Sequence, residues 1–263
     1  MTSTPLDHAV IRHRRILELA RQTGSVTVEA LAAEFGVSSQ TIRKDLNQLS
    51  QVAMLSRVHG GAVTTSGVDN LDHGARRSFA SAAKTAIGAA AARLIPDGAS
   101  LFITIGTTTE AVAQALTGHR NLLVITNNLN VVDILRGTPS IEILTAGGRV
   151  RAADRAVVGT LAMDFIRGFK TDFAVIGASG IDGDGTLLDF DVDEVRVSQT
   201  IIAQSRKVIL AADSSKLHRP APIRIAGLDA IDYLVIDRLC DPAVLAACHR
   251  ANVDVVEAFA KGR

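Results

Sequence analysis

A glycine followed by three threonines stands between a strand-like and a helix-like segment in ITIGTTTEAVAQAL (103–116). The apolar residues before the glycine are β-branched, and apolar residues return at helical spacing after the threonines. Such a junction leaves free backbone N–H groups and hydroxyls at a helix N-terminus, where a phosphate group can bind. We therefore predict a phosphate-binding loop formed by Gly106, Thr107, Thr108 and Thr109.

Three further polar loops follow strand-like segments, and each is rich in glycine or in neutral hydrogen-bonding side chains. Any one of them alone is commonly just a tight strand–helix turn, but four together favour a site for a polar small molecule. No Walker loop and no G-x-G-x-x-G pattern is present, so we expect no nucleotide cofactor. The further candidate ligand-binding residues are Asn127, Asn128, Gly147, Gly148, Gly177 and Gly180.

An acidic stretch, DGDGTLLDFDVDEV (182–195), could accept hydrogen bonds from ligand hydroxyls, best through Asp189 and Glu194. An EF-hand does not fit it, because Glu194 stands where that loop needs glycine. We therefore predict no metal site. Lys216, in ADSSK after another strand-like segment, could add positive charge to the ligand site. None of the seven histidines lies in a glycine loop, so we predict no catalytic residue and no enzyme.

These loops require strands that alternate with helices. The predicted strands are residues 100–105, 122–126, 141–145, 173–177, 207–212 and 233–237, and the predicted helices are residues 84–94, 110–116, 129–135, 192–204 and 242–251. Alternation of this kind indicates a mostly parallel sheet with helices on both faces. Ligands of such sheets bind at the carboxyl ends of the strands, where the polar loops would meet.

The first 63 residues have a different pattern, that of three short helices and a hairpin. The first helix runs from Ile11 to Arg21 and ends by Gly24. The second begins after the cap Thr27 and ends at Gly36. The third, SSQTIRKDLNQL, is capped by Ser38 or Ser39. A tight turn joins the last two helices, and MLSRVHGGAV would form a β-hairpin wing. This order predicts a winged helix-turn-helix.

The third helix carries the residue types that a DNA recognition helix needs at its N-terminal end. Glutamine suits adenine, arginine suits guanine, and neighbouring cations suit phosphates. Arg12, Arg14, Lys44 and Arg57 would neutralise phosphates. The alternative for each residue is an ordinary solvated helix face. The predicted DNA-binding residues are Ser39, Gln40, Thr41, Arg43, Lys44, Arg57 and His59.

Composition sets broad limits on the class of protein. The chain has 263 residues, 47% hydrophobic and 21% charged, with a formal net charge of +1, so any electropositive surface must be local. No apolar run is long enough for a membrane span, and the N-terminus lacks the apolar segment of a secretory signal. The two cysteines, Cys240 and Cys248, match no zinc or redox motif. We expect a reduced, cytoplasmic protein without membrane partners.

Two parts of the chain resemble one known family. VTVEALAAEFGVSSQTIRKDLNQL with RVHGGA looks like the DNA-binding signature of the DeoR family of bacterial sugar-metabolism repressors, and the order GTTT, TNN, GG, GASGID, ADSSK resembles its sensor domain. The resemblance implies a fold similar to ribose-5-phosphate isomerase and a phosphorylated polyol or sugar, such as glycerol 3-phosphate, as effector. Three positions depart from the family pattern. Ala53 stands where the family usually has Gly or Asn, Thr104 where it usually has Asp, and Ser198 where many members have Lys.

The sequence thus predicts an α/β protein with a winged helix-turn-helix at 1–63, a linker at 64–80 and an effector-sensing domain at 81–263. We expect a transcriptional repressor that binds double-stranded operator DNA as a homodimer or higher homo-oligomer and is released by its effector, without a cofactor. The alternatives are a regulator that responds to a different phosphosugar, a sugar-phosphate isomerase or lyase with Asp189 or Glu194 as base, and a scaffold that has lost its ligand.

Overall fold

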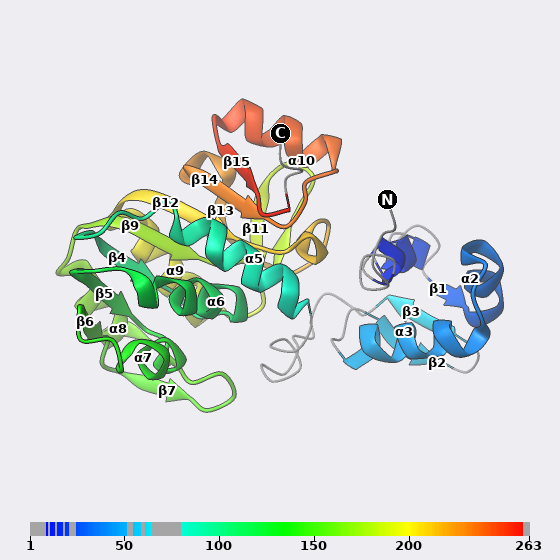
Figure 1. Cartoon of the computed structure of the whole chain (residues 1–263), viewed down its shortest axis with the longest axis horizontal. Helices are drawn as coiled ribbons and strands as arrows, with labels where there is room; N and C mark the ends of the chain where they lie inside the picture. Colours follow the sequence, from blue (N-terminus) through cyan, green and yellow to red (C-terminus); the bar gives the residue numbers. More distant parts are fainter. Residues whose placement is uncertain are drawn as a thin grey trace. The chain divides into compact units, whose positions relative to one another are not determined.

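The chain forms two compact units, Met1–Phe79 and Ala80–Arg263, which we call the head and the sensor unit (Figure 1). The computed structural model describes residues 9, 11–13, 15–17, 19–20, 25–51, 55–58, 61–64 and 80–259. Several sequence predictions lie outside the described residues: the first helix's end at Gly24, Arg14, Ala53, His59 and residues 65–79 of the predicted linker. Thr64, the first residue of the predicted linker, instead ends strand β3 of the head.

The head combines helices with a small antiparallel sheet. Its described residues between 9 and 20 are helical, and they are followed by β1 (Ser25–Thr27), α2 (Val28–Phe35), α3 (Ser39–Gln51), β2 (Leu55–Val58) and β3 (Gly61–Thr64). The predicted hairpin is confirmed, because β2 pairs with β3 in antiparallel fashion. The sequence did not reveal β1, which adds a third strand beside β3.

Local hydrogen bonds set the ends of the two central helices. Thr27 Oγ1 accepts from Ala30 N at 3.2 Å and caps α2, and Gly36 ends that helix with φ of +63°, a conformation that glycine adopts without strain. Ser38, not Ser39, caps α3, since Ser38 Oγ accepts from Thr41 N at 3.1 Å. The predicted stripe of α3 is fully buried in the core of the head: Ile42, Leu46 and Leu49.

The sensor unit is built on a seven-stranded parallel sheet in the order β15-β14-β12-β9-β4-β5-β6. Its strands are β4 (Ser100–Ile103), β5 (Leu122–Thr126), β6 (Ile141–Thr145), β9 (Thr171–Ile176), β12 (Ser205–Ala211), β14 (Tyr233–Ile236) and β15 (Asp254–Glu257). All six predicted strands are present: β5 and β6 have the predicted bounds, the ends of the other four differ by at most two residues, and the edge strand β15 was missed.

Helices cover both faces of this sheet, as predicted (Figure 1). One core lies under α5 (Ser81–Ala92), α6 (Thr107–Ala115) and α7 (Leu129–Leu135), and the other under α8 (Thr160–Arg167), α9 (Val192–Ala203) and α10 (Pro242–Ala251). Alternate strand residues enter opposite cores, Leu101 and Ile103 the first and Phe102 the second, as the two-residue period of a strand requires. The short helix α8 was not predicted.

Two small antiparallel elements lie outside the main sheet. One is the hairpin of β7 (Arg149–Arg151) and β8 (Ala156–Val158), and the other is the sheet β10-β11-β13, formed by Gly180–Ile181, Thr186–Asp189 and Ile223–Gly227. The turn between β10 and β11 contains two Asp-Gly pairs, and Gly185 there has φ of +94°. That dipeptide is a hairpin signal, so the sequence contained the information for this turn.

The strand order places one topological switch point in the sheet. From β4 the chain continues to β5 and β6 on one side, and it then returns to β9 on the other side of β4. A crevice at the carboxyl ends of β4 and β9 is the expected ligand position in such a sheet. Within the described residues, no helix is long and apolar enough to cross a membrane, and no group of His, Cys, Asp and Glu could hold a metal ion.

Gly88 lets the helices α5 and α6 touch through their backbones, and its replacement by alanine is expected to destabilise the sensor unit. A Cβ atom on Gly88 would lie 2.4 Å from the carbonyl oxygen of Ala111. Overpacking of this kind costs about 1–3 kcal/mol, and the better helix propensity of alanine offsets about 1 kcal/mol of it. Thermal unfolding of Gly88→Ala checks this, with Gly118→Ala as the matched control because its Cβ would meet nothing within 4 Å. An unchanged melting temperature for Gly88→Ala would contradict the prediction.

Candidate DNA-binding helix and effector site

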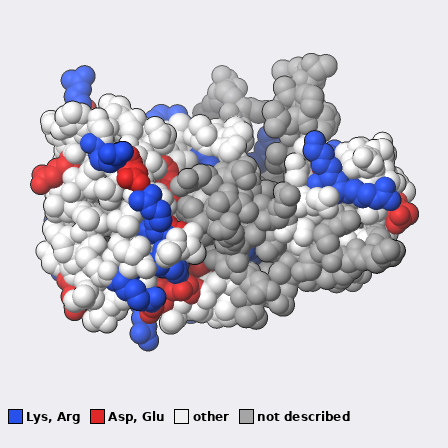
Figure 2. All heavy atoms as spheres, turned by 90° about the horizontal axis from the view of Figure 1, so that it is seen from below, with Lys and Arg blue, Asp and Glu red and all other residues white. Residues whose placement is uncertain are grey.

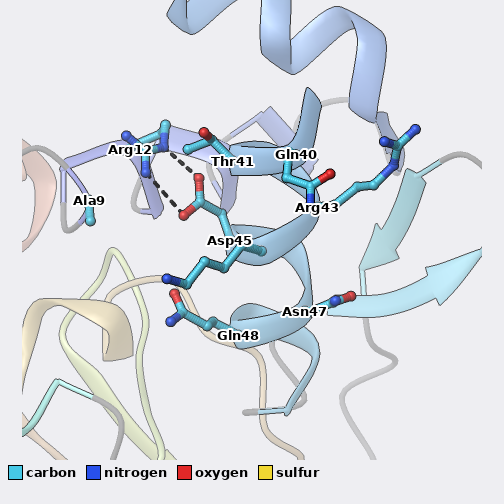
Figure 3. Close-up of a pocket in the computed structure, with 9 residues that line it drawn as sticks. Ala9, Arg12, Gln40, Thr41, Arg43, Asp45, Asn47 and Gln48 are labelled. Carbon is cyan, nitrogen blue, oxygen red and sulfur yellow. Dashed lines mark hydrogen bonds and ion pairs between the residues drawn. The ribbon is translucent and has the colours of Figure 1, made fainter. Parts of the chain in front are cut away.

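The polar face of α3 is turned to solvent on the side opposite its buried stripe. Gln40, Arg43 and Lys44 are exposed, and Ser39 and Thr41 are half-buried (Figure 3). Arg43 extends away from the helix in Figure 3 and forms no ion pair with a described residue. Five of the predicted DNA-binding residues therefore share the accessible end of one helix, as base readout requires. The side chain of Arg57 lies outside the described residues.

Asp45 is a buried acid on the same helix, and it ties α3 to the first helix of the head. Its carboxylate accepts two hydrogen bonds from Arg12, at 2.5 Å from Nε and 3.1 Å from Nη2, and it lies 2.9 Å from His13 Nε2. Burial alone would raise the pKa of Asp45, but His13 and Arg12 together hold it below its ordinary value. The carboxylate is thus charged at neutral pH, and its charge is compensated.

A hollow runs beside α3 between the first helix and the recognition face (Figure 3). Its lining residues are Ala9, Arg12, Gln40, Thr41, Arg43, Lys44, Asp45, Asn47 and Gln48. Three cations and one compensated acid therefore surround it. On the face drawn in Figure 2, Lys and Arg side chains of the head, at the right, lie next to one another with an acidic side chain at the end of the row, and those of the sensor unit are mixed with Asp and Glu.

Replacing Arg43 with alanine is expected to weaken operator binding by about 1–3 kcal/mol and to relax the preference at one base pair, because arginine reads guanine through two hydrogen bonds. The matched variant Lys44→Ala should weaken binding equally for all sequences and lower the salt dependence, as the loss of a phosphate contact does. Gel-shift titrations at fixed salt against a set of single-base-pair variants measure both. Unchanged affinity and preference for Arg43→Ala would remove this residue from the recognition surface.

The loop before α6 leaves backbone donors at the start of a helix. Gly106 has φ of +142°, which disfavours any residue with a Cβ. The first backbone hydrogen bond of the helix is from Glu110 N to Gly106 O. Among the described residues, the N–H groups of Thr107, Thr108 and Thr109 form no hydrogen bond, so three donors of the first turn remain for a ligand.

Two of the predicted ligand residues instead hold this loop in place. Thr109 is fully buried, and its hydroxyl donates to the carbonyl oxygens of Thr104 and Gly106, both at 2.8 Å. Asn128 is also fully buried and caps α7, since its Oδ1 accepts from Asn130 N at 2.9 Å. These side-chain groups are therefore used within the protein.

Asn127, at the end of β5, differs from its neighbour. Its Nδ2 donates to Val157 O at 3.1 Å, but its buried Oδ1 has no hydrogen-bond partner among the described residues. A buried acceptor without a donor costs free energy, so this atom is the side-chain group of the loop that best fits a ligand donor. Gly147 and Gly148 follow the adjacent strand β6 and are exposed, with Gly148 at φ of +145°.

Gly177 and Gly180, after β9, have different surroundings. Gly177 lies next to the glycine loop, since its Cβ would be 3.7 Å from Ile105 O. Gly180 is buried under the backbone of Arg219, whose carbonyl oxygen would lie 2.1 Å from a Cβ. A close backbone approach thus explains the glycine at 180 without a ligand.

The two acids that the sequence proposed as hydroxyl acceptors are both engaged. Asp189 Oδ1 accepts from Ser179 Oγ at 3.1 Å and from Phe190 N at 2.7 Å. Glu194, in the first turn of α9, forms an ion pair of 2.6 Å with Arg151 of the β7–β8 hairpin. Arg151 also pairs with Asp154 at 2.5 Å and with Asp191 at 2.7 Å. Glu194 therefore anchors the hairpin to α9.

Lys216 lies in the short helix η2 (Ser214–Lys216) after β12, beside a buried charge cluster. Burial alone would raise the pKa of Asp213, but the charges of Lys216 and Lys84 hold it below its ordinary value. Burial and the charge of Asp213 raise the pKa of Asp237, whose carboxylate accepts from Ser214 N at 2.6 Å. The atom Asp213 Oδ2 is buried without a hydrogen-bond partner among the described residues.

Lys84, Asp213 and Asp237 were not predicted as site residues. Lys84 is a buried lysine near the start of α5. The signal for it was present in the sequence, because it is the one charged residue in SAAKTAIGAAAA, and lysine is rarely buried without a partner. Asp213 and Asp237 follow the neighbouring parallel strands β12 and β14. The predicted alternation of strands and helices could have indicated that both acids lie at the same edge of the sheet.

Family comparisons agree with both units. Residues 12–67 match the DeoR-like helix-turn-helix domain, and residues 80–238 match the DeoR C terminal sensor domain. The chain belongs to the DeoR family. The resemblance and the fold class that the sequence predicted are thereby confirmed, and the helix-turn-helix is a DNA-binding domain.

Among DeoR-family relatives, the chain is 46% identical over 224 residues to the glycerol-3-phosphate regulon repressor of Haemophilus influenzae, which covers 85% of this chain and 88% of the relative. It is 43% identical over 226 residues to the repressor of the same name from Escherichia coli, which covers 86% and 90%. These relatives are transcriptional repressors, not enzymes, so the predicted absence of an enzyme activity is supported and the isomerase alternative is not.

Two solved structures are similar to parts of this chain at low identity. Ribose 5-phosphate isomerase from Plasmodium falciparum is similar at 14% identity with a TM-score of 0.38, over 51% of this chain and 52% of that chain. The eIF2B delta subunit from Chaetomium thermophilum is similar at 12% identity with a TM-score of 0.50, over 87% and 71%.

Proposed function

We propose that this DeoR-family protein represses transcription by binding operator DNA through α3 and is released when a phosphorylated polyol or sugar binds the sensor unit. The observation that carries the proposal is the recognition helix itself. Its apolar stripe of Ile42, Leu46 and Leu49 is fully buried, so the polar residues of its N-terminal end are presented to solvent.

The effector half of the proposal is supported by the residues at the carboxyl ends of the parallel strands. Three N–H groups of α6 that no described residue accepts from, and the positive end of the helix dipole, favour an anion. Lys216 follows β12, which lies two strands from β4 in the same parallel sheet, and it adds a cation at the same edge of the sheet. Glycerol 3-phosphate is the first candidate, because relatives that are 46% and 43% identical are named for the glycerol-3-phosphate regulon.

A homodimer or higher homo-oligomer is part of this proposal, as is a cytoplasmic location where the chromosome is accessible. Operators are commonly two-fold symmetric, and two heads in one assembly match two half-sites. The proposed site residues remain those of the glycine loops together with Lys216, and Thr107, Asn127 and Lys216 supply the polar side chains.

Selection of duplexes from a random-sequence library by the full chain tests the proposal. We expect enrichment of a two-fold symmetric sequence, and we expect glycerol 3-phosphate to release the selected duplex in a gel shift while glycerol does not. Failure to enrich any sequence would contradict DNA recognition. Enrichment without release by any of a panel of phosphorylated polyols and sugars would contradict the effector half and favour a sensor unit that has lost its ligand.

A further inference from the structure

We propose that Arg12 of the first helix contacts a DNA phosphate and that Asp45 is the positioning residue that holds Arg12 in place for this contact. The inference rests on the proposed function and extends it, because it gives the phosphate contact expected of Arg12 a fixed geometry and a positioning partner. It also assigns a role to an acid on a recognition helix, where a negative charge would otherwise repel DNA.

The geometry of the pair restricts the guanidinium group. Nε and Nη2 of Arg12 both donate to the carboxylate of Asp45, at 2.5 and 3.1 Å, and this two-point contact fixes the plane of the group. Nη1 forms no hydrogen bond with a described residue, and 15% of the Arg12 side chain remains exposed. The free edge of the guanidinium is thus available from a fixed position.

The position itself favours a phosphate. Arg12 lines the hollow beside α3 together with Lys44 and Thr41, a second cation and a hydroxyl (Figure 3). Arg12 contacts both carboxylate oxygens of Asp45, and His13 Nε2 lies 2.9 Å from one of them. The Asp45 side chain is only 4% exposed. The net charge offered to the hollow by Arg12, Lys44 and Asp45 is therefore positive, which suits the sugar–phosphate backbone beside a groove-bound helix.

A matched pair of variants separates this contact from the general charge of the head. Arg12→Gln and Arg15→Gln each remove one positive charge from the same helix. Arg15 does not line the hollow and instead pairs with Glu34 at 3.3 Å on the surface of the head. Binding of the full chain to the duplex selected from the random library is measured between about 0.1 and about 0.3 M salt.

We expect Arg12→Gln to weaken binding about tenfold at about 0.1 M salt and to lower the slope of log K against log salt by about 1. Arg15→Gln should leave both values near those of the parent. Equal slopes for the two variants would overturn the proposed phosphate contact, because the charge of Arg12 would then act no differently from that of a surface arginine.

The double variant Arg12→Gln/Asp45→Asn tests the alternative that Arg12 serves only to neutralise Asp45. It replaces the ion pair by two uncharged amides, so no unpaired charge is left buried in the head. If Arg12 contacts phosphate, the double variant stays about tenfold weaker with the lower slope. Recovery of the parent affinity and slope would overturn the contact.

The single variant Asp45→Asn tests the positioning role by the sign of its effect. Loss of an acid from a DNA-binding surface strengthens binding on electrostatic grounds alone, whereas loss of the two-point contact should weaken it. We expect weaker binding, with thermal unfolding recorded so that every variant is compared in its folded state. Stronger binding would overturn the role of Asp45. If the parent enriches no duplex at all, the proposed function fails and this inference fails with it.

Discussion

Glycerol 3-phosphate is expected to bind the full chain at least about a hundredfold more tightly than glycerol. Each hydrogen bond to a charged group contributes about 1.5–3 kcal/mol, and the loop after β4 offers several donors to the phosphate. The N–H groups of Thr107, Thr108 and Thr109 are free within the described residues, and they lie at the positive end of the α6 dipole. Isothermal titration calorimetry at pH 7 with both ligands measures the ratio.

Inorganic phosphate is the control for the anion alone and should bind more weakly than glycerol 3-phosphate. Equal affinities for glycerol and glycerol 3-phosphate would refute a phosphate site at this loop. Binding of neither ligand, but of a larger phosphosugar, would instead point to Thr104 and Ser198, the neutral residues where the family usually has an acid and a cation. Both are buried, at 2% and 5% exposure, so they would act through the shape and charge of the site's surroundings.

The second large effect is expected from Thr107→Val, which keeps the β-branched shape and removes one hydroxyl donor. Loss of a hydrogen bond to the effector phosphate should lower effector affinity by about 1.5–3 kcal/mol, roughly ten- to more than a hundredfold. Operator binding without effector should stay unchanged, since the head is a separate unit. In cells the variant would act as a non-inducible repressor. Calorimetry with effector and gel shifts with operator measure the two properties.

The alternative role for Thr107 is a structural one at the helix end. Gly106, the residue before the first turn of α6, has no side chain that could cap the helix, and the Thr107 hydroxyl forms no hydrogen bond with a described residue. Thr117→Val, at the other end of this segment, is the matched control, because its hydroxyl donates to Gln114 O at 2.9 Å. A lowered melting temperature with unchanged effector affinity for Thr107→Val would make the residue structural.

The predictable parts of the fold were those with a strong local pattern. The runs of β4, β5, β6, β9, β12 and β14 are largely apolar and bounded by polar loops, so they could be placed from the sequence. The edge strand β15 (DVVE) is short and partly exposed, and β1 gains its identity only by pairing with β3. Such elements depend on partners distant in the sequence, and no local pattern indicates them.

The candidate site shows the same division. The glycine loops could be found because glycine and threonine after a strand are a local signal. The sequence could not predict which of their side chains are buried, because this depends on packing. Thr109 and Asn128 are fully buried, whereas Thr107 is not. Likewise, the partner of Glu194 is Arg151, and nothing near Glu194 in the sequence indicates that ion pair.

The backbone contact at Gly88 has a mechanical consequence for signalling. Figure 1 shows α5 and α6 side by side; α6 begins at the proposed phosphate loop, and α5 is the first helix after the chain leaves the head. Where Gly88 meets Ala111, no side chain lies between the two helices that could change rotamer and absorb a movement. A ligand that shifts α6 is therefore expected to shift α5 as well.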